Sequence, residues 1–183
     1  MSSRNTLVRS LHDTGLAAWF GGSLMGAVGL NAAAAAVSSP RERLTVASAG
    51  WARWAPVQWA AIIAHGIGGV GLIVGNAGRL AVQEEGRVNT KVKLGLTLVA
   101  VGATVYSGVV GMKMGAKAGE PVEGTTEPAE NTSDELAAAQ SQQRILQWVT
   151  PAVTLILIVL GAQQGEQQRP VANSNWVQRL LKR

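Results

Sequence analysis

The sequence predicts an all-α integral membrane protein, a four-helix bundle with both termini in the cytoplasm. Hydrophobic residues make up 47% of the 183 residues and charged residues only 15%, well below the usual quarter of a soluble domain. The charges gather in a few clusters, and the stretches between the clusters are almost free of charge. These stretches approach the ~20 residues that a helix needs to cross a bilayer. The lipid bilayer is therefore the first predicted partner.

The first predicted span covers residues 14–37, which carry no charged side chain. Asp13 precedes it, where a carboxylate suits the positive end of the helix dipole. Arg4 and Arg9 also fit the start of a cleaved signal peptide. The apolar stretch exceeds the core of a signal peptide, which is about 7–15 residues long. We therefore expect a retained helix.

The second predicted span covers residues 55–77. Trp51, Trp54 and Trp59 lie at its start, and tryptophan prefers the headgroup region of a membrane. Pro56 is expected in the first turn of the helix, where its missing N–H costs little. Residues 44–50 are predicted to form an interfacial turn or a short helix.

The third and fourth predicted spans cover residues 94–114 and 145–162. A charged connection, residues 79–93, leads into the third span. Pro151 is expected in the first turn of the fourth helix. The whole chain, residues 1–183, is thus predicted to be a single membrane domain.

Two polar segments complete the chain. Residues 115–143 contain six acidic residues and two prolines, a composition that predicts a flexible acidic external loop. The end of that segment, residues 134–143, is a candidate helical run into the fourth span. In residues 170–183, apolar side chains at helical spacing oppose basic ones, which is typical of an amphipathic helix on an anionic leaflet. A solvated tail is the alternative for this cytoplasmic segment.

The distribution of basic residues predicts the orientation. Ten Lys and Arg residues fall on the side of the amino terminus, the second connection and the tail, and six fall on the other side. The positive-inside rule places the side with ten in the cytoplasm. The predicted location is the inner (plasma) membrane of a bacterium, as a multi-pass protein.

Small residues recur at every fourth position in three of the predicted spans. Such spacing lets helix backbones approach closely in lipid. Packing within the bundle is one reading of this pattern, and a face for a second copy or a larger membrane complex is the other. The residues singled out for helix packing are Gly22, Gly26, Gly68, Gly71, Gly75, Ser107, Gly111 and Gly115.

His65 lies near the middle of the second predicted span and is the candidate cofactor-binding residue. Ionisable groups inside membranes are expensive and often mark functional sites. A haem ligand, a metal ligand and a proton-handling group are the open roles. A hydrogen-bonded packing residue is the alternative. The other histidine, His12, lies at the end of the first span, so we do not expect the two to pair directly.

Several classes of site are excluded by residue type. The chain has no cysteine, so disulfides and thiolate metal sites cannot form. The basic residues flank apolar segments and form no dense patch interleaved with aromatics, which argues against nucleic acid as a partner. Residues 66–71 imitate a dinucleotide loop, but they lie inside an apolar span and lack the strand that such a loop requires. No hydrolase or phosphate-binding motif appears, so we expect no enzyme.

One segment carries a resemblance. Residues 11–22, LHDTGLAAWFGG, resemble the opening of uncharacterised small membrane proteins of actinobacteria. The stretch Trp19-Phe20-Gly21-Gly22 is also similar to one in four-helix proteins of the copper-resistance-D type. That resemblance implies a small four-span protein, although the methionine- or histidine-rich path of a copper carrier is missing here.

The sequence thus predicts a non-enzymatic inner-membrane protein acting as a scaffold or accessory subunit through its glycine-rich faces. The alternative is a small haem-binding, metal-binding or transport protein that uses His65. The identity of any cofactor stays unknown at this stage.

Overall fold

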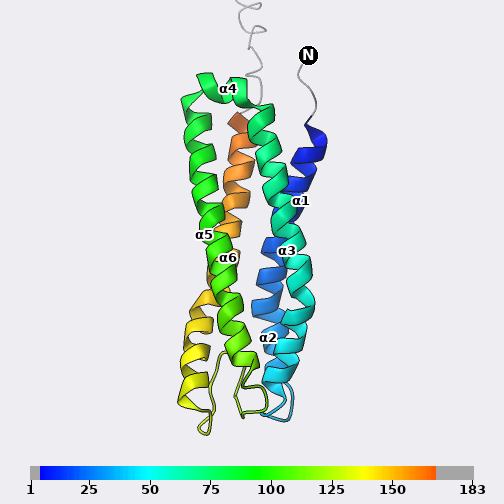
Figure 1. The fold of residues 1–183 in the computed structure, drawn as a ribbon, viewed down its shortest axis with the longest axis vertical. Coiled ribbons are helices and arrows are strands. Elements are labelled where there is room, and N and C mark those ends of the chain that lie inside the picture. Colours follow the sequence, from blue (N-terminus) through cyan, green and yellow to red (C-terminus); the bar gives the residue numbers. More distant parts are fainter. Residues whose placement is uncertain (1–4, 168–183) are drawn as a thin grey trace, which may run out of the picture.

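The computed structural model describes residues 5–167, except for the side chains of Arg79, Val82, Glu166 and Gln167, and forms an elongated helical bundle (Figure 1). The predicted amphipathic tail, residues 170–183, lies outside the described residues. The elements, in chain order, are α1 (Thr6–Met25), the π-helical turn η1 (Gly26–Leu30), α2 (Asn31–Ala35), α3 (Arg43–Gly75), α4 (Ala77–Val82), α5 (Glu84–Gly115) and α6 (Asp134–Gln167).

Four helical segments are long and apolar enough to cross a membrane. They are Thr6–Ala35, Arg43–Gly75, Glu84–Gly115 and Asp134–Gly165. The prediction of an all-α protein with four candidate spans is thereby confirmed. Each helix is longer than the apolar stretch within it. A helix of 33 residues measures about 50 Å, against a hydrocarbon core of about 30 Å.

The extra length corrects two predictions about proline. Pro56 lies inside α3 and Pro151 lies inside α6, so neither residue begins a helix. The polar residues before each apolar stretch continue the helix, because polar side chains do not interrupt backbone hydrogen bonds. For the same reason residues 44–50 belong to α3, and most of the charged connection, residues 79–93, is helical.

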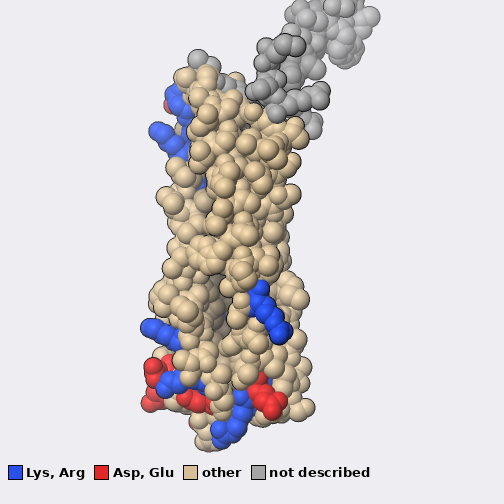
Figure 2. Space-filling model, turned by 45° about the vertical axis from the view of Figure 1, so that its right-hand side comes forward, with Lys and Arg blue, Asp and Glu red and all other residues tan. Residues whose placement is uncertain are grey.

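The surface of the bundle is apolar in its middle and charged towards its ends. Figure 2 shows one face on which a broad band carries no Lys, Arg, Asp or Glu side chain. Large apolar side chains such as Ile63, Val70 and Leu98 are more than half exposed. Apolar exposure on this scale is exceptional for a monomer in water and ordinary for a surface that faces lipid.

The helices associate as two hairpins. The first helical segment, Thr6–Ala35, comprises α1, η1 and α2, and we call it the first rod. It packs most extensively against α3, and α5 packs most extensively against α6. Contacts between α1 and α6 join the hairpins, whereas α3 and α5 meet at few points. The bundle is therefore closed on one side and open between α3 and α5.

Glycine allows α1 and α3 to approach very closely. A Cβ atom built on Gly15 would lie 2.5 Å from the Ala61 carbonyl oxygen and 2.6 Å from the His65 nitrogen. A Cβ atom on Gly68 would lie 2.5 Å from the Val8 carbonyl oxygen. Small residues at such crossings are the usual means of helix packing in lipid. These contacts fix the register of the first hairpin.

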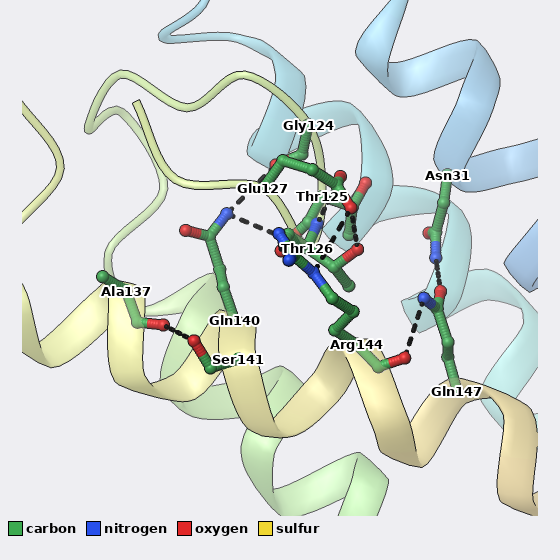
Figure 3. A network of polar contacts seen from close by, with 10 residues as sticks. All are labelled: Asn31, Gly124, Thr125, Thr126, Glu127, Ala137, Gln140, Ser141, Arg144 and Gln147. Carbon is green, nitrogen blue, oxygen red and sulfur yellow. Dashed lines mark hydrogen bonds and ion pairs between the residues drawn. The ribbon is translucent and has the colours of Figure 1, made fainter. Parts of the chain in front are cut away.

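The loop at residues 116–133 follows a defined course over the end of the bundle. Arg43 donates hydrogen bonds to the carbonyl oxygens of Val37, Val122 and Glu123, at 2.9–3.1 Å. Gln140 of α6 donates to the carbonyl oxygens of Gly124 and Thr125 at 3.0 and 3.1 Å (Figure 3). These bonds attach the loop to both hairpins. Its predicted flexibility stays a prediction, and its composition alone did not reveal the attachments.

The base of the loop is joined to the start of α6. The Ser133 hydroxyl and its backbone N–H, the latter 3.0 Å from the carboxylate, lower the pKa of Glu120. A hydrogen bond to Glu135, 2.8 Å away, raises the pKa of Lys117. Both shifts favour the charged forms near neutral pH, and the Lys117–Glu135 ion pair ties the loop to the first turn of α6.

Candidate functional site

The opening between α3 and α5 widens into a cavity of about 620 Å³ near α4. We call it the histidine cavity. All four long helices line it, and the polar side chains among its walls include Arg9, His12, Asp13, His65, Glu84, Glu85, Thr90, Lys93, Thr97 and Gln164. Most of these residues belong to segments that the sequence pattern predicts as separate parts: the edge of one span, the middle of another and a connection.

The two histidines pair directly, so the prediction that they lie apart is wrong. The ring centroids of His12 and His65 are 4.3 Å apart, and the rings are tilted by 38°. Trp19 approaches the His65 ring edge-on at 6.2 Å. The pairing follows from the register of α1 against α3, because the close approach at Gly68 brings the His12 backbone beside α3. An apolar run along one helix does not reveal this register.

Hydrogen bonds fix the orientation of the His65 ring. Its Nδ1 lies 3.1 Å from the His12 carbonyl oxygen, and its Nε2 lies 3.4 Å from the Thr97 hydroxyl. A carbonyl oxygen can only accept, so Nδ1 carries the hydrogen and donates it. In the neutral ring, Nε2 is then the acceptor and Thr97 the donor. His65 is only 5% exposed, and it forms part of the inner wall of the cavity.

His12 is held by its neighbour in the sequence. Its Nδ1 donates to the Asp13 carboxylate at 2.8 Å. The carboxylate thereby fixes the ring that stacks on His65. The side chain of Asp13 is more than half exposed. The contacts from Asp13 to His12 and from His12 to His65 therefore lead from the rim of the cavity to its inner wall.

The geometry of this pair does not fit a haem held between two histidines. Axial ligands bind the iron from opposite faces of the porphyrin, and rings in contact leave no space for the macrocycle between them. Within residues 5–167, no group of three or more His, Cys, Asp or Glu side chains is placed to hold a metal ion.

Lys93 is the cation at the inner part of the cavity. It comes from α5 and is hydrogen-bonded to the side-chain oxygen of Gln164 on α6. The Gln164 amide in turn donates to the Thr90 hydroxyl at 3.4 Å. Among the described residues, no carboxylate lies within ion-pair distance of the Lys93 ammonium. The sequence pattern places Lys93 in a connection and does not predict its position in the cavity, although its spacing from Thr90 and Thr97 puts all three on one helix face.

The small residues predicted to pack helices fall into two groups. In the first group, an added Cβ would collide with an atom on the opposite side of the α1–α3 hairpin, and for Gly75 with Asn5, which directly precedes α1. The members of this group are Gly22, Gly26, Gly68, Gly71 and Gly75. In the second group, on α5, a Cβ on Gly111 would meet nothing within 4 Å, and one on Gly115 would touch only the Ser48 side chain. Ser107 accepts a hydrogen bond from Gln143 at 2.7 Å.

This division matters for function. The glycines of α1 and α3 are occupied by packing within the chain, so they leave little of that face for another protein. The α5 positions instead border open space between α3 and α5.

No protein-family model matches the chain, and no curated protein or solved structure matches it significantly.

Proposed function

We propose that this chain is a non-enzymatic, multi-pass protein of the plasma membrane that binds a small anionic amphiphile in the histidine cavity. The head group accepts a hydrogen bond from the Lys93 ammonium, next to the His65–Thr97 hydrogen bond, and the apolar chain leaves between α3 and α5. A carrier or a sensor needs this kind of site, and the proposal keeps His65 as a binding residue without a metal or a haem.

The observation that carries the proposal is that the Lys93 ammonium forms no ion pair with any carboxylate among the described side chains. An ammonium group that is partly withdrawn from solvent is costly unless an anion accompanies it, and the neutral side chain of Gln164 is its hydrogen-bond partner. Asp13, Glu84 and Glu85 line the same cavity but form no ion pair with Lys93, and an anionic head group would supply that contact. Phosphates and carboxylates both accept charge-assisted hydrogen bonds from such a group.

The rest of the cavity supports an amphiphile rather than a small soluble ion. Val70 and Leu94 line the cavity and are more than half exposed, so apolar surface borders the polar end. Because α3 and α5 meet at few points, an alkyl chain can extend from the cavity directly into lipid. Ligand sites often combine apolar walls with a few convergent polar groups in this way.

The distribution of charge supports an orientation with both termini in the cytoplasm. The amino-terminal end of α1 and the short helix α4 lie at the same end of the bundle, opposite the loop at residues 116–133 (Figure 1). The sequence has more Lys and Arg residues on the first side, which the positive-inside rule assigns to the cytoplasm. The histidine cavity would then open towards the inner leaflet.

Replacing Lys93 by methionine tests the proposal. Native mass spectrometry of the detergent-purified chain would measure 1:1 binding of dodecyl phosphate and of dodecanol. Loss of a charge-assisted hydrogen bond costs roughly 1.5–3 kcal/mol, so we expect dodecyl phosphate to bind at least tenfold more weakly, with dodecanol unaffected.

The matched control is Lys91→Met, two residues away on α5, where Lys91 is exposed and does not line the cavity. This variant should bind dodecyl phosphate like the original chain. Equal binding by the Lys93 and Lys91 variants would refute the proposal.

An accessory-subunit role is a second candidate. Added Cβ atoms on Gly95 and Gly102 of α5 would meet nothing within 4 Å, and these residues lie two turns apart on one helix face. A larger protein that co-purifies with the original chain and is lost on Gly102→Leu would favour this second role.

A further inference from the structure

A second cavity, of about 530 Å³, lies between α3 and α5 at the end nearer the acidic loop. We call it the amide cavity. It shares no lining residue with the histidine cavity, and Figure 2 shows a hollow in this half of the molecule. None of its lining residues is charged. The polar side chains that line it are Ser23, Asn31, Ser48, Gln58, Thr104, Ser107, Thr125, Gln143, Gln147 and Thr150. Two tryptophans, Trp51 and Trp59, complete the polar part of the wall.

Two buried polar atoms in this wall have no hydrogen-bond partner within the described chain. They are the side-chain oxygen of Gln143 and the hydroxyl oxygen of Thr125. Gln143 is 9% exposed and Thr125 is 4% exposed. Buried polar groups are almost always satisfied, so each exception needs a cause. Two of the four such atoms in the described residues belong to the lining of this one cavity, where a ligand can supply the partner, and the other two, in Asn89 and Gln140, belong to neither cavity.

The wall around these atoms is held in place. The Gln143 amide nitrogen donates to the Ser107 hydroxyl at 2.7 Å, which turns its oxygen end away from that bond. The Trp51 indole donates to Asn31 at 3.0 Å, and Asn31 donates to Gln147 at 2.9 Å (Figure 3). Asn31 directly follows the π-helical turn η1, whose extra residue changes the face that the first rod presents to the bundle. Side chains fixed in this way lose little entropy when they bind a ligand.

We propose that the amide cavity binds an uncharged amphiphile whose head carries hydroxyl groups. A hydroxyl both donates and accepts, so a head with hydroxyl groups can supply a donor to the Gln143 oxygen and a partner to the Thr125 hydroxyl. A charged head would be left without a counter-charge, which is strongly unfavourable in such surroundings. The exposed apolar side chains of Val105, Val109 and Met112 border the cavity and accompany the chain of the ligand into lipid. The site does not depend on the function proposed for the histidine cavity.

Native mass spectrometry of the detergent-purified chain tests this proposal with 1-dodecanoylglycerol as the probe. Its diacetate, in which both hydroxyls are capped, is the matched compound. We expect the probe to bind at 1:1 stoichiometry and at least tenfold more tightly than the diacetate. A parallel arm with decylhydroquinone distinguishes the sources of the head group. Preference for the glycerol ester indicates a glycerolipid, and preference for the phenol indicates a quinol. Equal binding of the probe and its diacetate would overturn the proposal.

Two variants locate the binding. Gly111→Leu fills the amide cavity, because an added Cβ there meets nothing within 4 Å, and it should abolish the 1:1 adduct. Gln143→Leu removes the unpartnered oxygen and should bind the probe and the diacetate equally. The controls are Gly102→Leu, which lines neither cavity, and Gln142→Leu, an exposed neighbour. Both controls should bind like the original chain.

Binding by Gly111→Leu at the original affinity would show that the probe lies elsewhere and would overturn the proposal. An added Cβ at Gly111 meets nothing within 4 Å, so Gly111→Leu keeps the test decisive should Gln143→Leu fail to fold. Dodecyl phosphate binding, which reports on Lys93, is measured on the same samples. A failure of one site is therefore distinguishable from a failure of the other.

Discussion

Replacing Gly68 by valine is expected to separate α1 from α3 and to lower the stability of the bundle by about 3 kcal/mol, the upper end of the usual cost of overpacking. The new Cβ would lie 2.5 Å from the Val8 carbonyl oxygen and 2.7 Å from the His12 Cα, and still closer to the His12 backbone nitrogen. These are backbone atoms, so they cannot turn aside as a flexible side chain can. The whole helix has to move instead.

The measurement is the midpoint of unfolding when the protein in a mild detergent is titrated with SDS. Gly66→Val is the matched control, because an added Cβ on Gly66 meets nothing within 4 Å. The two sites lie on the same helix and receive the same β-branched residue, so helix propensity cancels between them. Equal midpoints for the two variants would mean that α1 and α3 do not cross as closely as described.

Replacing Arg43 by methionine is expected to release the loop at residues 116–133. The guanidinium group, which is largely buried, donates to three carbonyl oxygens, two of them in the loop. Hydrogen bonds to charged groups contribute about 1.5–3 kcal/mol, and 1.4 kcal/mol corresponds to a tenfold change in an equilibrium constant. Local opening of the loop should therefore become at least about tenfold more frequent.

A protease that cleaves after glutamate provides the measurement, because Glu123, Glu127 and Glu130 lie within the loop. The control is Arg41→Met, since Arg41 is exposed and makes one hydrogen bond to the loop, to the Gly119 carbonyl oxygen at 3.2 Å. We expect rapid cleavage of the Arg43 variant and slow cleavage of the Arg41 variant. The same rate in both would show that Arg43 does not anchor the loop.

The sequence was sufficient to predict the four helices because their cause is local. Long uncharged stretches such as residues 14–37 and 145–162 need lipid around them and must satisfy their own backbone groups there. The ends of the helices were less predictable. Polar residues before Pro56 and before Pro151 continue the helix, and a hydropathy pattern cannot detect a helix that extends beyond the hydrocarbon.

The candidate site was only partly predictable because it depends on the register between helices. His65 stood out as an ionisable residue within an apolar run, but its contact with His12 is set by how Gly68 packs on α1. Hydropathy alone assigns Lys93 to a connection, because the apolar stretch begins after it. Its place in a cavity depends on where the neighbouring helices lie, which the sequence of α5 does not specify. Gln143 looked like an ordinary residue of a polar stretch, and only the fold shows that its oxygen is buried without a partner.

In the proposed arrangement, the apolar band of the bundle lies in hydrocarbon, with the acidic loop outside and α4 in the cytoplasm. The chain has no cysteine, so single-cysteine variants give a clean test. The three positions are Asn131 in the loop, Ala81 in α4 and Leu98 in the band, and Leu98 is 64% exposed in the isolated chain.

A membrane-impermeant maleimide applied to intact bacterial cells should label Asn131→Cys alone. After permeabilisation it should also label Ala81→Cys, while Leu98→Cys should react only in SDS, because lipid covers that position. Labelling of Leu98→Cys in native membranes would contradict the account, and so would labelling of Ala81→Cys in intact cells.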